Sequence, residues 1–406
     1  MNKSIWIINQ YTGGPKYGMN YRSYYLAKQF KKNGAEVAIF AGSYSHLFST
    51  LPKVDGLFTN EKVDEIDFIW VKTPVYKSSK SIGRMWNMLV FMLMLFFFKV
   101  KSMKKPDVII ISSLSLFPII NAYFWAKKFD AKLIFEIRDL WPQTLIELGN
   151  MSSKHPLVLF LGFFEKFGYK HADRVVSLLA NSKKYMQDRG MIESKFKYIP
   201  NGVDLNEVLN SDNLDEKFKS KIPQDKFIVG YVGTLGIANA LDYLIEAAKE
   251  LSNYTKIHFV IVGKGGEKEN LINFVSKENL NNVTFIEAIP KRQVQSMLSH
   301  FGVCYIGLRK EPLFLYGVSP NKLFDYMYSA KPILYAIDSG TQNLILEANC
   351  GISIEAENMM AISTAILKLL NLNNDEIGKM GINGKEYVLK YHTYKNLAKE
   401  YEEIFE

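Results

Sequence analysis

Short runs of β-branched and aromatic residues alternate with amphipathic stretches along all 406 residues, and this alternation occurs twice over. The short runs predict β-strands, whereas a hydrophobic period of 3.6 residues predicts helices. The expected strands are Ile5–Ile8, Glu36–Phe40, Phe68–Val71, Val108–Ile111, Lys132–Ile137, Arg174–Leu178, Phe227–Val232, Ile257–Val262, Val283–Ile286, Gly302–Ile306, Ile333–Ala336 and Gly351–Ile354. The expected helices include Tyr21–Asn33, Ile119–Phe129, Ala240–Leu251, Lys268–Glu278, Arg292–Ser299, Asn321–Ser329 and Asn358–Leu370. Such alternation predicts parallel sheets built from βαβ units.

The two rounds of this pattern predict an α/β protein with two doubly wound, Rossmann-like domains. The length and the hydrophobic fraction of 48% suit two folded domains. The boundary is expected near Tyr198–Asp204, where a strand end meets Pro, Asn and Gly. We therefore expect an N-terminal domain at residues 1–200, a second domain at 201–385 and a closing helix at 386–406.

Charge divides unevenly between the two halves of the chain. Residues 1–190 hold 27 Lys and Arg against 14 Asp and Glu, whereas residues 191–406 hold 23 against 27. A basic half is suited to nucleic acid, anionic lipid or a phosphorylated substrate. The two cysteines, Cys304 and Cys350, lie in apolar stretches, and residues 1–8 lack the features of a signal peptide. Both observations favour a reduced, cytoplasmic protein.

Two apolar stretches lie in the basic half. Met88–Phe98 is an unbroken run of 11 apolar residues followed by four lysines within residues 99–105, and Leu157–Phe164 precedes Lys166 and Lys170. A membrane-spanning helix needs about 20 apolar residues, so neither stretch predicts one. Apolar surface edged with lysines is typical of a protein that lies on an anionic membrane. A buried helix of an α/β domain is the alternative explanation of both stretches.

The segment Ser319–Asp325 reads as a loop that turns directly into a helix. Ser319 is expected to cap this helix and Pro320 to occupy its first position. A helix start offers unpaired N–H groups and a partial positive charge, which suit a phosphate. Lys322 adds a full charge, and Asp325 lies three residues later on the same face. These groups predict a site for a diphosphate and sugar hydroxyls, although an ordinary capped helix with a surface ion pair has the same pattern.

Small or turn residues follow several of the expected strands. They are Gly13-Gly14 after the first strand, Gly233-Thr234-Leu235-Gly236 at the start of the second domain, Gly263-Lys264-Gly265-Gly266, and Ile289-Pro290. Glycine at such a turn lets the backbone approach a phosphate or a sugar. Neither the G-x-G-x-x-G pattern nor a Walker A loop is present, which disfavours a dehydrogenase or an NTPase. Because carboxyl ends of parallel strands meet at one sheet edge, the second domain is expected to bind a nucleotide there.

Charged residues also stand at a strand end of the first domain. Glu136, Arg138 and Asp139 are close to an apolar strand and call for partners. They form either a structural ion pair or a carboxylate and guanidinium that point into a binding cleft. His46 follows the second strand and is a further candidate, although a lone histidine is more often structural.

With these features the chain resembles a retaining glycosyltransferase of the GT-B fold, family 4. The segments that carry the resemblance are Gly13-Gly14, Ala172–Val176, Ile199–Asp204, Gly233–Gly236, Gly263–Gly265 and the closing helix. The resemblance implies two Rossmann-like domains that face a cleft, with the C-terminal helix crossing back to the first. Glu136–Pro142 and Ser319–Asp325 look more particularly like the branch that adds N-acetylated 6-deoxyhexosamines, such as N-acetyl-L-fucosamine, to lipid-linked bacterial O-antigen or capsule glycans.

The family's E-x7-E motif can be placed on this sequence. Its second glutamate, which holds the ribose hydroxyls in the family, falls on Asp325, and its first glutamate falls on Gly317. The family's phosphate-binding arginine and lysine fall on Thr234 and Asn239, so both charges are missing. Lys322, with the helix start, is expected to replace them. Any mechanism that depends on the first glutamate is thereby placed in doubt.

The resemblance implies a UDP-sugar donor bound mainly to residues 220–340. Uracil is expected near Gly263, ribose on Asp325 and the diphosphate beside Lys322. The expected donor-binding residues are Gly14, Gly233, Thr234, Gly263, Ile289, Pro290, Ser319, Pro320, Asn321, Lys322 and Asp325. No Asp-x-Asp motif or cluster of metal ligands is visible in the sequence, so neither a metal nor another cofactor is expected.

The expected catalytic groups come from both domains. Lys322 would stabilise the charge that develops on the leaving β-phosphate. Asp139 or Glu136 would orient or deprotonate the acceptor hydroxyl, while Arg138, on which the family's N-domain histidine falls, and His46 would bind the acceptor. The implied acceptor is a saccharide on polyprenyl diphosphate, reached by a protein lying on the cytoplasmic face of an anionic membrane. No nucleic-acid partner is expected.

Two other readings use the same residues. A UDP-sugar 2-epimerase of the same fold would bind UDP similarly but would need no lipid acceptor. A non-enzymatic module that binds nucleic acid or anionic membrane through the basic half would have no use for the glycine turns of the second domain, and its binding to nucleic acid would depend strongly on salt.

Overall fold

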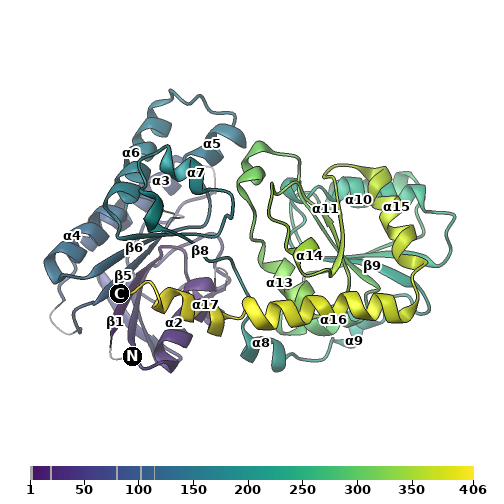
Figure 1. Ribbon diagram of the computed structural model, residues 1–406, viewed down its shortest axis with the longest axis horizontal. Coiled ribbons are helices and arrows are strands. Elements are labelled where there is room, and N and C mark those ends of the chain that lie inside the picture. The colour runs from purple at the N-terminus through teal and green to yellow at the C-terminus, as the bar shows by residue number, and fades with distance from the viewer. Residues whose placement is uncertain (1–2, 19–20, 79–80, 101–102, 114) are drawn as a thin grey trace. The chain divides into compact units, whose positions relative to one another are not determined.

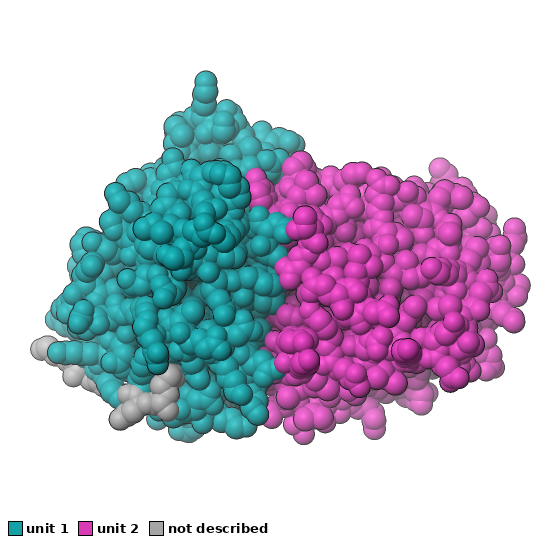
Figure 2. Space-filling view, in the orientation of Figure 1, with its two compact units in different colours: residues 1–200, 394–406 teal, residues 201–393 magenta. Residues whose placement is uncertain are grey.

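The computed structural model describes residues 3–18, 21–78, 81–100, 103–113 and 115–406. The chain forms two compact units, which Figure 2 colours separately. Unit 1 contains residues 1–200 and 394–406, and unit 2 contains residues 201–393. Each unit is built on a largely parallel β-sheet covered by helices (Figure 1).

Unit 1 has an eight-stranded sheet in the order β3-β4-β2-β1-β5-β6-β7-β8. The strands are β1 (Ser4–Ile8), β2 (Glu36–Gly42), β3 (Phe58–Val63), β4 (Ile66–Val71), β5 (Val108–Ser112), β6 (Lys132–Ile137), β7 (Arg174–Ser177) and β8 (Phe196–Tyr198). The helices are α1 (Gly14–Tyr17), α2 (Arg22–Lys32), α3 (Ile82–Leu95), α4 (Ile119–Phe129), α5 (Gln143–Glu147), α6 (Pro156–His171), α7 (Lys183–Gln187), the 3₁₀ turn η1 (Glu193–Lys195) and α17 (Tyr394–Glu402). Neighbouring strands are parallel except β3, which pairs with β4 in the antiparallel sense.

Strand β1 lies inside this sheet and is buried on both faces, because its alternate side chains pack against opposite helix layers. Ile5 and Ile7 belong to the core that contains residues of α2 and α17. Trp6 faces the other way, and its ring lies 5.4 Å from the ring of Trp125 on α4. The strand order reverses at β1, between β2 and β5, so the carboxyl end of β1 is where a doubly wound sheet places a ligand.

Unit 2 has a six-stranded parallel sheet in the order β11-β10-β9-β12-β13-β14. The strands are β9 (Phe227–Val232), β10 (Ile257–Val262), β11 (Val283–Ile286), β12 (Val303–Gly307), β13 (Ile333–Ala336) and β14 (Gly351–Ile354). The helices are α8 (Leu205–Leu209), α9 (Glu216–Lys219), α10 (Leu241–Glu250), α11 (Lys268–Lys277), α12 (Val294–Ser299), α13 (Asn321–Tyr328), α14 (Leu344–Glu347), α15 (Met359–Leu370) and α16 (Asn374–Tyr391), with 3₁₀ turns η2 (Ile237–Asn239), η3 (Lys291–Gln293) and η4 (Pro312–Tyr316). The order reverses at β9, which makes the turn after β9 the corresponding ligand position.

The strands expected from the hydrophobic pattern are all present, and each end lies within two residues of its expected position. The pattern does not predict β3 or β8. Strand β3 is an edge strand whose segment Thr59–Lys62 is polar and only partly buried, so it lacks the hydrophobic run that marks a buried strand. Strand β8 has three residues, too few to show a period.

The closing helix expected at residues 386–406 is corrected by the structure. Helix α16 ends at Tyr391 within unit 2, and the segment that belongs to unit 1 begins at Tyr394. The break arises because the His392 carbonyl accepts a hydrogen bond from the Val203 backbone N–H at 2.8 Å, and Thr393 forms a β-bridge with Val203. Two helices therefore replace the single expected one.

Candidate active site

Two glycine turns lie against each other at the carboxyl edge of the unit 2 sheet. The Gly233 N–H donates to the Val262 carbonyl at 3.0 Å. A Cβ added to Gly263 would lie 1.8 Å from the Gly233 carbonyl oxygen, and one added to Gly265 would lie 2.1 Å from the Leu235 carbonyl oxygen. Only glycine permits so close an approach of two backbones. Part of the glycine pattern therefore serves the packing of one turn on another, beside any ligand.

The start of α13 differs from the expected cap. The helix begins at Asn321 with Pro320 as its N-cap residue, and no side chain caps it. The Ser319 hydroxyl instead accepts from the Asn201 backbone N–H at 2.8 Å, and the Asn201 amide donates to the Ser319 carbonyl at 2.5 Å. The prediction that Ser319 caps the helix with Pro320 in its first turn is therefore wrong. No side chain of the described residues caps the first-turn N–H groups of α13. This end of the helix is therefore suited to an anion.

Lys322 points from α13 to the turn after β9. Its Nζ donates to the Tyr231 hydroxyl at 2.8 Å and to the Asn239 side-chain oxygen at 2.6 Å, and it lies 4.4 Å from the centre of the Tyr231 ring. The Thr234 carbonyl in turn accepts from the Tyr231 hydroxyl and from the Asn239 amide. Burial without a carboxylate partner lowers the pKa of Lys322 to about 7. The structure thus holds this amine where the phosphate is expected.

Asp325 does not pair with Lys322 as its spacing suggests. Both of its carboxylate oxygens accept from the Lys291 Nζ, at 2.7 and 2.6 Å. Lys291 follows Ile289-Pro290 in the connection after β11, so this connection lies beside α13. The end of β11 also lies next to Gly263, whose N–H donates to the Ile286 carbonyl at 3.0 Å.

The described residues of unit 2 therefore bring the expected donor residues to one sheet edge. The turn after β9 supplies Gly233 and the exposed Thr234, the turn after β10 supplies Gly263, and the β11 connection supplies Ile289 and Pro290. Helix α13 adds the exposed Asn321 and the half-buried Lys322. Sequence reasoning missed Tyr231 and Lys291, since neither residue type marks a nucleotide site by itself.

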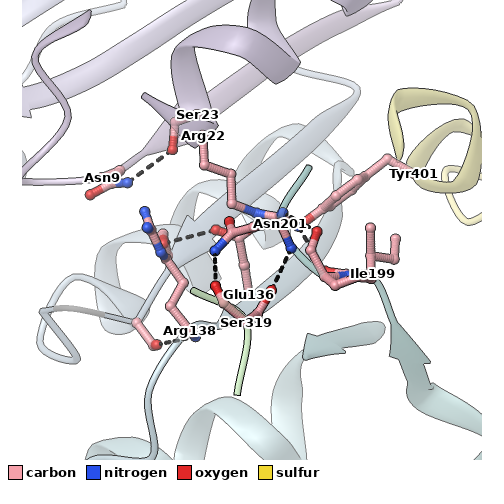
Figure 3. Close-up of polar contacts among 12 residues, drawn as sticks. Asn9, Arg22, Ser23, Glu136, Arg138, Ile199, Asn201, Ser319 and Tyr401 are labelled. Atoms are coloured by element: carbon pink, nitrogen blue, oxygen red, sulfur yellow. Dashed lines mark hydrogen bonds and ion pairs between the residues drawn. The ribbon is translucent and has the colours of Figure 1, made fainter. Parts of the chain in front are cut away.

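In unit 1, Glu136 lies at the end of β6 in a buried polar cluster (Figure 3). Its Oε2 accepts from the Arg22 Nε at 2.8 Å and from the Tyr401 hydroxyl, while its Oε1 accepts from the Ser112 hydroxyl at 3.0 Å. Burial raises the pKa of Glu136, but the guanidiniums of Arg22 and Arg138 outweigh it and hold the pKa below its usual value. Glu136 is one half of a buried ion pair with Arg22, which favours the structural alternative for this carboxylate over the role of catalytic base.

Arg22 also holds the end of unit 1. Its guanidinium donates to the carbonyl of Ile199 at 2.9 Å (Figure 3). It also donates to the carbonyl of Pro200 at 2.5 Å. The side chain is fully buried and comes from the first turn of α2. Tyr401 adds α17 to the same cluster. Sequence reasoning missed both residues, because an arginine and a tyrosine on amphipathic helices look like ordinary surface residues.

The remaining unit 1 candidates lie near strand ends. Asp139 is exposed as a residue, but protein atoms surround its carboxyl group, and this desolvation raises the carboxyl pKa despite the opposing charge of Arg138. The Arg138 backbone N–H donates to the Ser113 hydroxyl at 3.0 Å. Gly14 begins α1 with a φ of 65°, a conformation that favours glycine. His46 is exposed, and its Nδ1 lies 2.7 Å from the Tyr76 hydroxyl.

Comparison with protein families accounts for both units. Residues 17–207 match the family described as Glycosyltransferase Family 4, and residues 212–387 match the family described as Glycosyl transferases group 1. The chain joins two glycosyltransferase domains. The expected GT-B fold is confirmed, since the solved structures that resemble this glycosyltransferase are GT-B enzymes.

Two curated relatives of the glycosyltransferase come from Escherichia coli. WcaI, named as a colanic acid biosynthesis glycosyl transferase of strain K12, is 24% identical over 276 residues, which cover 66% of this chain and 67% of WcaI. The O-antigen biosynthesis glycosyltransferase WclY is 28% identical over 152 residues, which cover 37% of this chain and 41% of WclY. The chain thus matches less than half the length of WclY.

Two solved structures resemble the glycosyltransferase along its whole length. Sucrose-phosphate synthase from Thermosynechococcus elongatus has a TM-score of 0.76 at 15% identity, covering 100% of this chain and 98% of that chain. HepE of Anabaena, solved with UDP and glucose, has a TM-score of 0.64 at 13% identity, covering 99% of each chain. At these identities the resemblance establishes the fold.

Proposed function

We propose that this glycosyltransferase moves a sugar from a UDP-sugar to a polyprenyl diphosphate-linked saccharide during synthesis of a bacterial surface polysaccharide. The observation that carries the donor assignment is the position of Lys322, held by Tyr231 and Asn239 at the start of α13. The names of WcaI and WclY support the polysaccharide, and the UDP bound to HepE supports the nucleotide. An N-acetylated 6-deoxyhexosamine such as N-acetyl-L-fucosamine is the sugar we propose, transferred with retention.

The donor would lie along the carboxyl edge of the unit 2 sheet. The diphosphate meets Gly233 and the uncapped start of α13, where N–H groups and the helix dipole favour an anion. Lys322 then stabilises the negative charge that grows on the β-phosphate as the sugar leaves, and such preorganised electrostatics usually make the largest catalytic contribution. We propose that neither a metal nor another cofactor takes part.

The nucleoside would occupy the adjoining turns. Uracil lies between Gly263 and Ile289-Pro290, and the ribose hydroxyls donate to Asp325. Lys291 fixes the orientation of that carboxylate through its contacts with both oxygens. The role parallels that of the second glutamate in the E-x7-E motif, with one methylene less.

The acceptor would be bound by unit 1. We assign Asp139 to orient or deprotonate the acceptor hydroxyl, because desolvation raises the pKa of this carboxyl group and so makes it a stronger base. Arg138 binds an acceptor phosphate, and His46 and Gly14 lie at the ends of neighbouring strands. An acceptor on a lipid requires the protein to work at the cytoplasmic face of the membrane as a peripheral protein.

A screen of nucleotides for stabilisation against heat tests the donor. We expect UDP and UDP-sugars to raise the melting temperature, whereas ADP and GDP should leave it unchanged. Lys322→Ala should remove most of the shift, while the matched variant Lys277→Ala, at the exposed end of α11, should keep it. Stabilisation by ADP or GDP without UDP would overturn the donor assignment, and conversion of UDP-N-acetylglucosamine without an acceptor would favour the epimerase.

A further inference from the structure

Three helices of unit 1 expose large apolar side chains to solvent. We call six of them, on α4, on α6 and just after α3, the aromatic face, and each is between 49% and 64% exposed. They are Phe96, Phe97, Phe124, Leu159, Phe160 and Phe163. Single exposed apolar residues are ordinary, but a grouped set marks an interaction site.

Ring contacts join these residues into one surface. The ring centres of Phe96 and Phe124 lie 6.3 Å apart, and this contact connects the end of α3 to α4. The ring centre of Tyr123, the neighbour of Phe124, lies 5.2 Å from that of Phe167 on α6. The ring centres of Phe167 and Phe163 lie 6.2 Å apart. The two apolar stretches of the sequence, about 60 residues apart, thus meet through α4.

Helix α3 is apolar on both sides, although only one side is covered. Met88, Phe91 and Leu95 are buried in the unit, whereas Trp86 and Leu93 lie on the exposed side at 55% and 39% exposure. A helix of this composition normally lies inside a core or a membrane. No helix among the described residues is long and apolar enough to cross a membrane. The exposed side of α3 is therefore suited to lying in an interface.

Exposed lysines lie on the same helices as the aromatic face, and we call them the lysine rim. Lys127 and Lys128 end α4, and Lys166 and Lys170 lie in the second half of α6, all four exposed. Burial and the charges of Lys170, Lys195 and Lys127 lower the pKa of His171, as expected where the local potential is positive. The aromatic face and its lysines together suit a partner that is apolar in its interior and anionic at its surface.

We propose that the aromatic face inserts into the outer part of an anionic bilayer, with the lysine rim at the level of the lipid phosphates. Helices α3, α4 and α6 then lie on the membrane in the manner of interfacial helices. A second copy of the chain fits less well, because it would bring the two lysine rims together. The inference rests on the proposed lipid-linked acceptor for its purpose, while its test is independent of catalysis.

Flotation with lipid vesicles tests the proposal. The full chain should bind vesicles of phosphatidylglycerol and phosphatidylcholine, should bind pure phosphatidylcholine far less, and should be weakened by salt. Leu159→Ser and Phe163→Ser should each lower vesicle partitioning about tenfold. The matched variants Leu209→Ser and Leu346→Ser remove equally exposed residues of unit 2, 70% and 63% exposed, and should leave partitioning unchanged. An equal loss of vesicle partitioning in the unit 1 and unit 2 variants would contradict the proposal. Partitioning that none of the four substitutions changes would also contradict it.

Tryptophan fluorescence locates the contact. Trp86 is exposed on α3, whereas Trp6 and Trp70 are fully buried. Bromine-labelled acyl chains should quench the emission of Trp86, and Trp86→Phe should remove most of the quenching, because Trp125 is buried and Trp141 is half-buried. Absence of quenching in vesicle-bound protein, or a dimer that the serine variants dissociate without any vesicle binding, would overturn the proposal. Heat stabilisation by UDP in the same variants reports separately on folding and on the donor site.

Discussion

Lys322 illustrates how a single side chain acquires its chemistry from its surroundings. An exposed lysine stays charged at neutral pH, but this amine contacts a phenol, an amide oxygen and an aromatic ring. Burial raises the pKa of Tyr231 and of Tyr326, so both phenols stay neutral and offer no compensating charge. Burial therefore lowers the pKa of the Lys322 amine to about 7.

This titration predicts the pH dependence of donor binding. Below its pKa Lys322 carries the charge that a diphosphate needs, and above it the charge must be restored by taking up a proton. The KM for the donor should therefore rise as pH increases above about 7, and UDP binding at pH above 7 should take up protons. Calorimetry in buffers of different ionisation enthalpy measures the uptake. Lys322→Met should abolish it while Lys277→Met retains it; uptake that persists without Lys322 would assign the titration elsewhere.

The carboxylates of Glu136 and Asp139, at the end of β6, lie in different environments. Glu136 is paired with the buried Arg22, so Glu136→Gln should leave that guanidinium uncompensated and lower the stability by about 3 kcal/mol. Asp139 is exposed, so Asp139→Asn should keep the melting temperature and lower kcat by about 10²-fold or more. Thermal unfolding and steady-state kinetics on both variants check the assignment. A stable Glu136→Gln variant with lost kcat would restore Glu136 as a catalytic residue.

At the scale of elements, α13 owes its position to contacts from several segments of unit 2. Asn201 holds the residue before its N-cap, Lys322 holds the turn after β9, and α16 packs along it. Helix α16 also approaches the connection that follows α13, because a Cβ added to Gly381 would lie 2.0 Å from the Ala330 carbonyl oxygen. Glycine at this position therefore sets the spacing between α16 and the end of α13.

A pair of alanine substitutions tests that spacing. Gly381→Ala should destabilise the protein by about 1–3 kcal/mol, since backbone must move to admit the methyl group. Gly378→Ala lies one turn earlier in α16, where nothing comes within 4 Å, and should stabilise the helix by about 0.5–1 kcal/mol. Chemical denaturation measures both. Equal effects at the two positions would show that the close approach is absent.

At the scale of the whole molecule, the uneven charge nearly follows the division into two units. The basic residues concentrate in unit 1, which also carries the aromatic face, and unit 2 carries the candidate donor site. This division predicts that salt should weaken vesicle binding while leaving UDP stabilisation nearly unchanged, because surface charges are screened more than buried ones.

The sequence by itself determined the α/β class and most of the buried strands, although it did not predict β3 or β8. Hydrophobic period is a local property, so the buried strands β6, β9, β10 and β13 could be delimited to the residue. The sequence also pointed to Lys322, because a lysine at a helix start after a strand is a local pattern.

Only the tertiary structure decided the partners of those residues. Asp325 pairs with Lys291 rather than with its helical neighbour, Ser319 with Asn201, and Glu136 with Arg22, over sequence separations of 34, 118 and 114 residues. The two apolar stretches, Met88–Phe98 and Leu157–Phe164, likewise form one surface because α4 lies between them. Such contacts depend on which strands neighbour each other and where side chains point, and neither property is encoded in a local period.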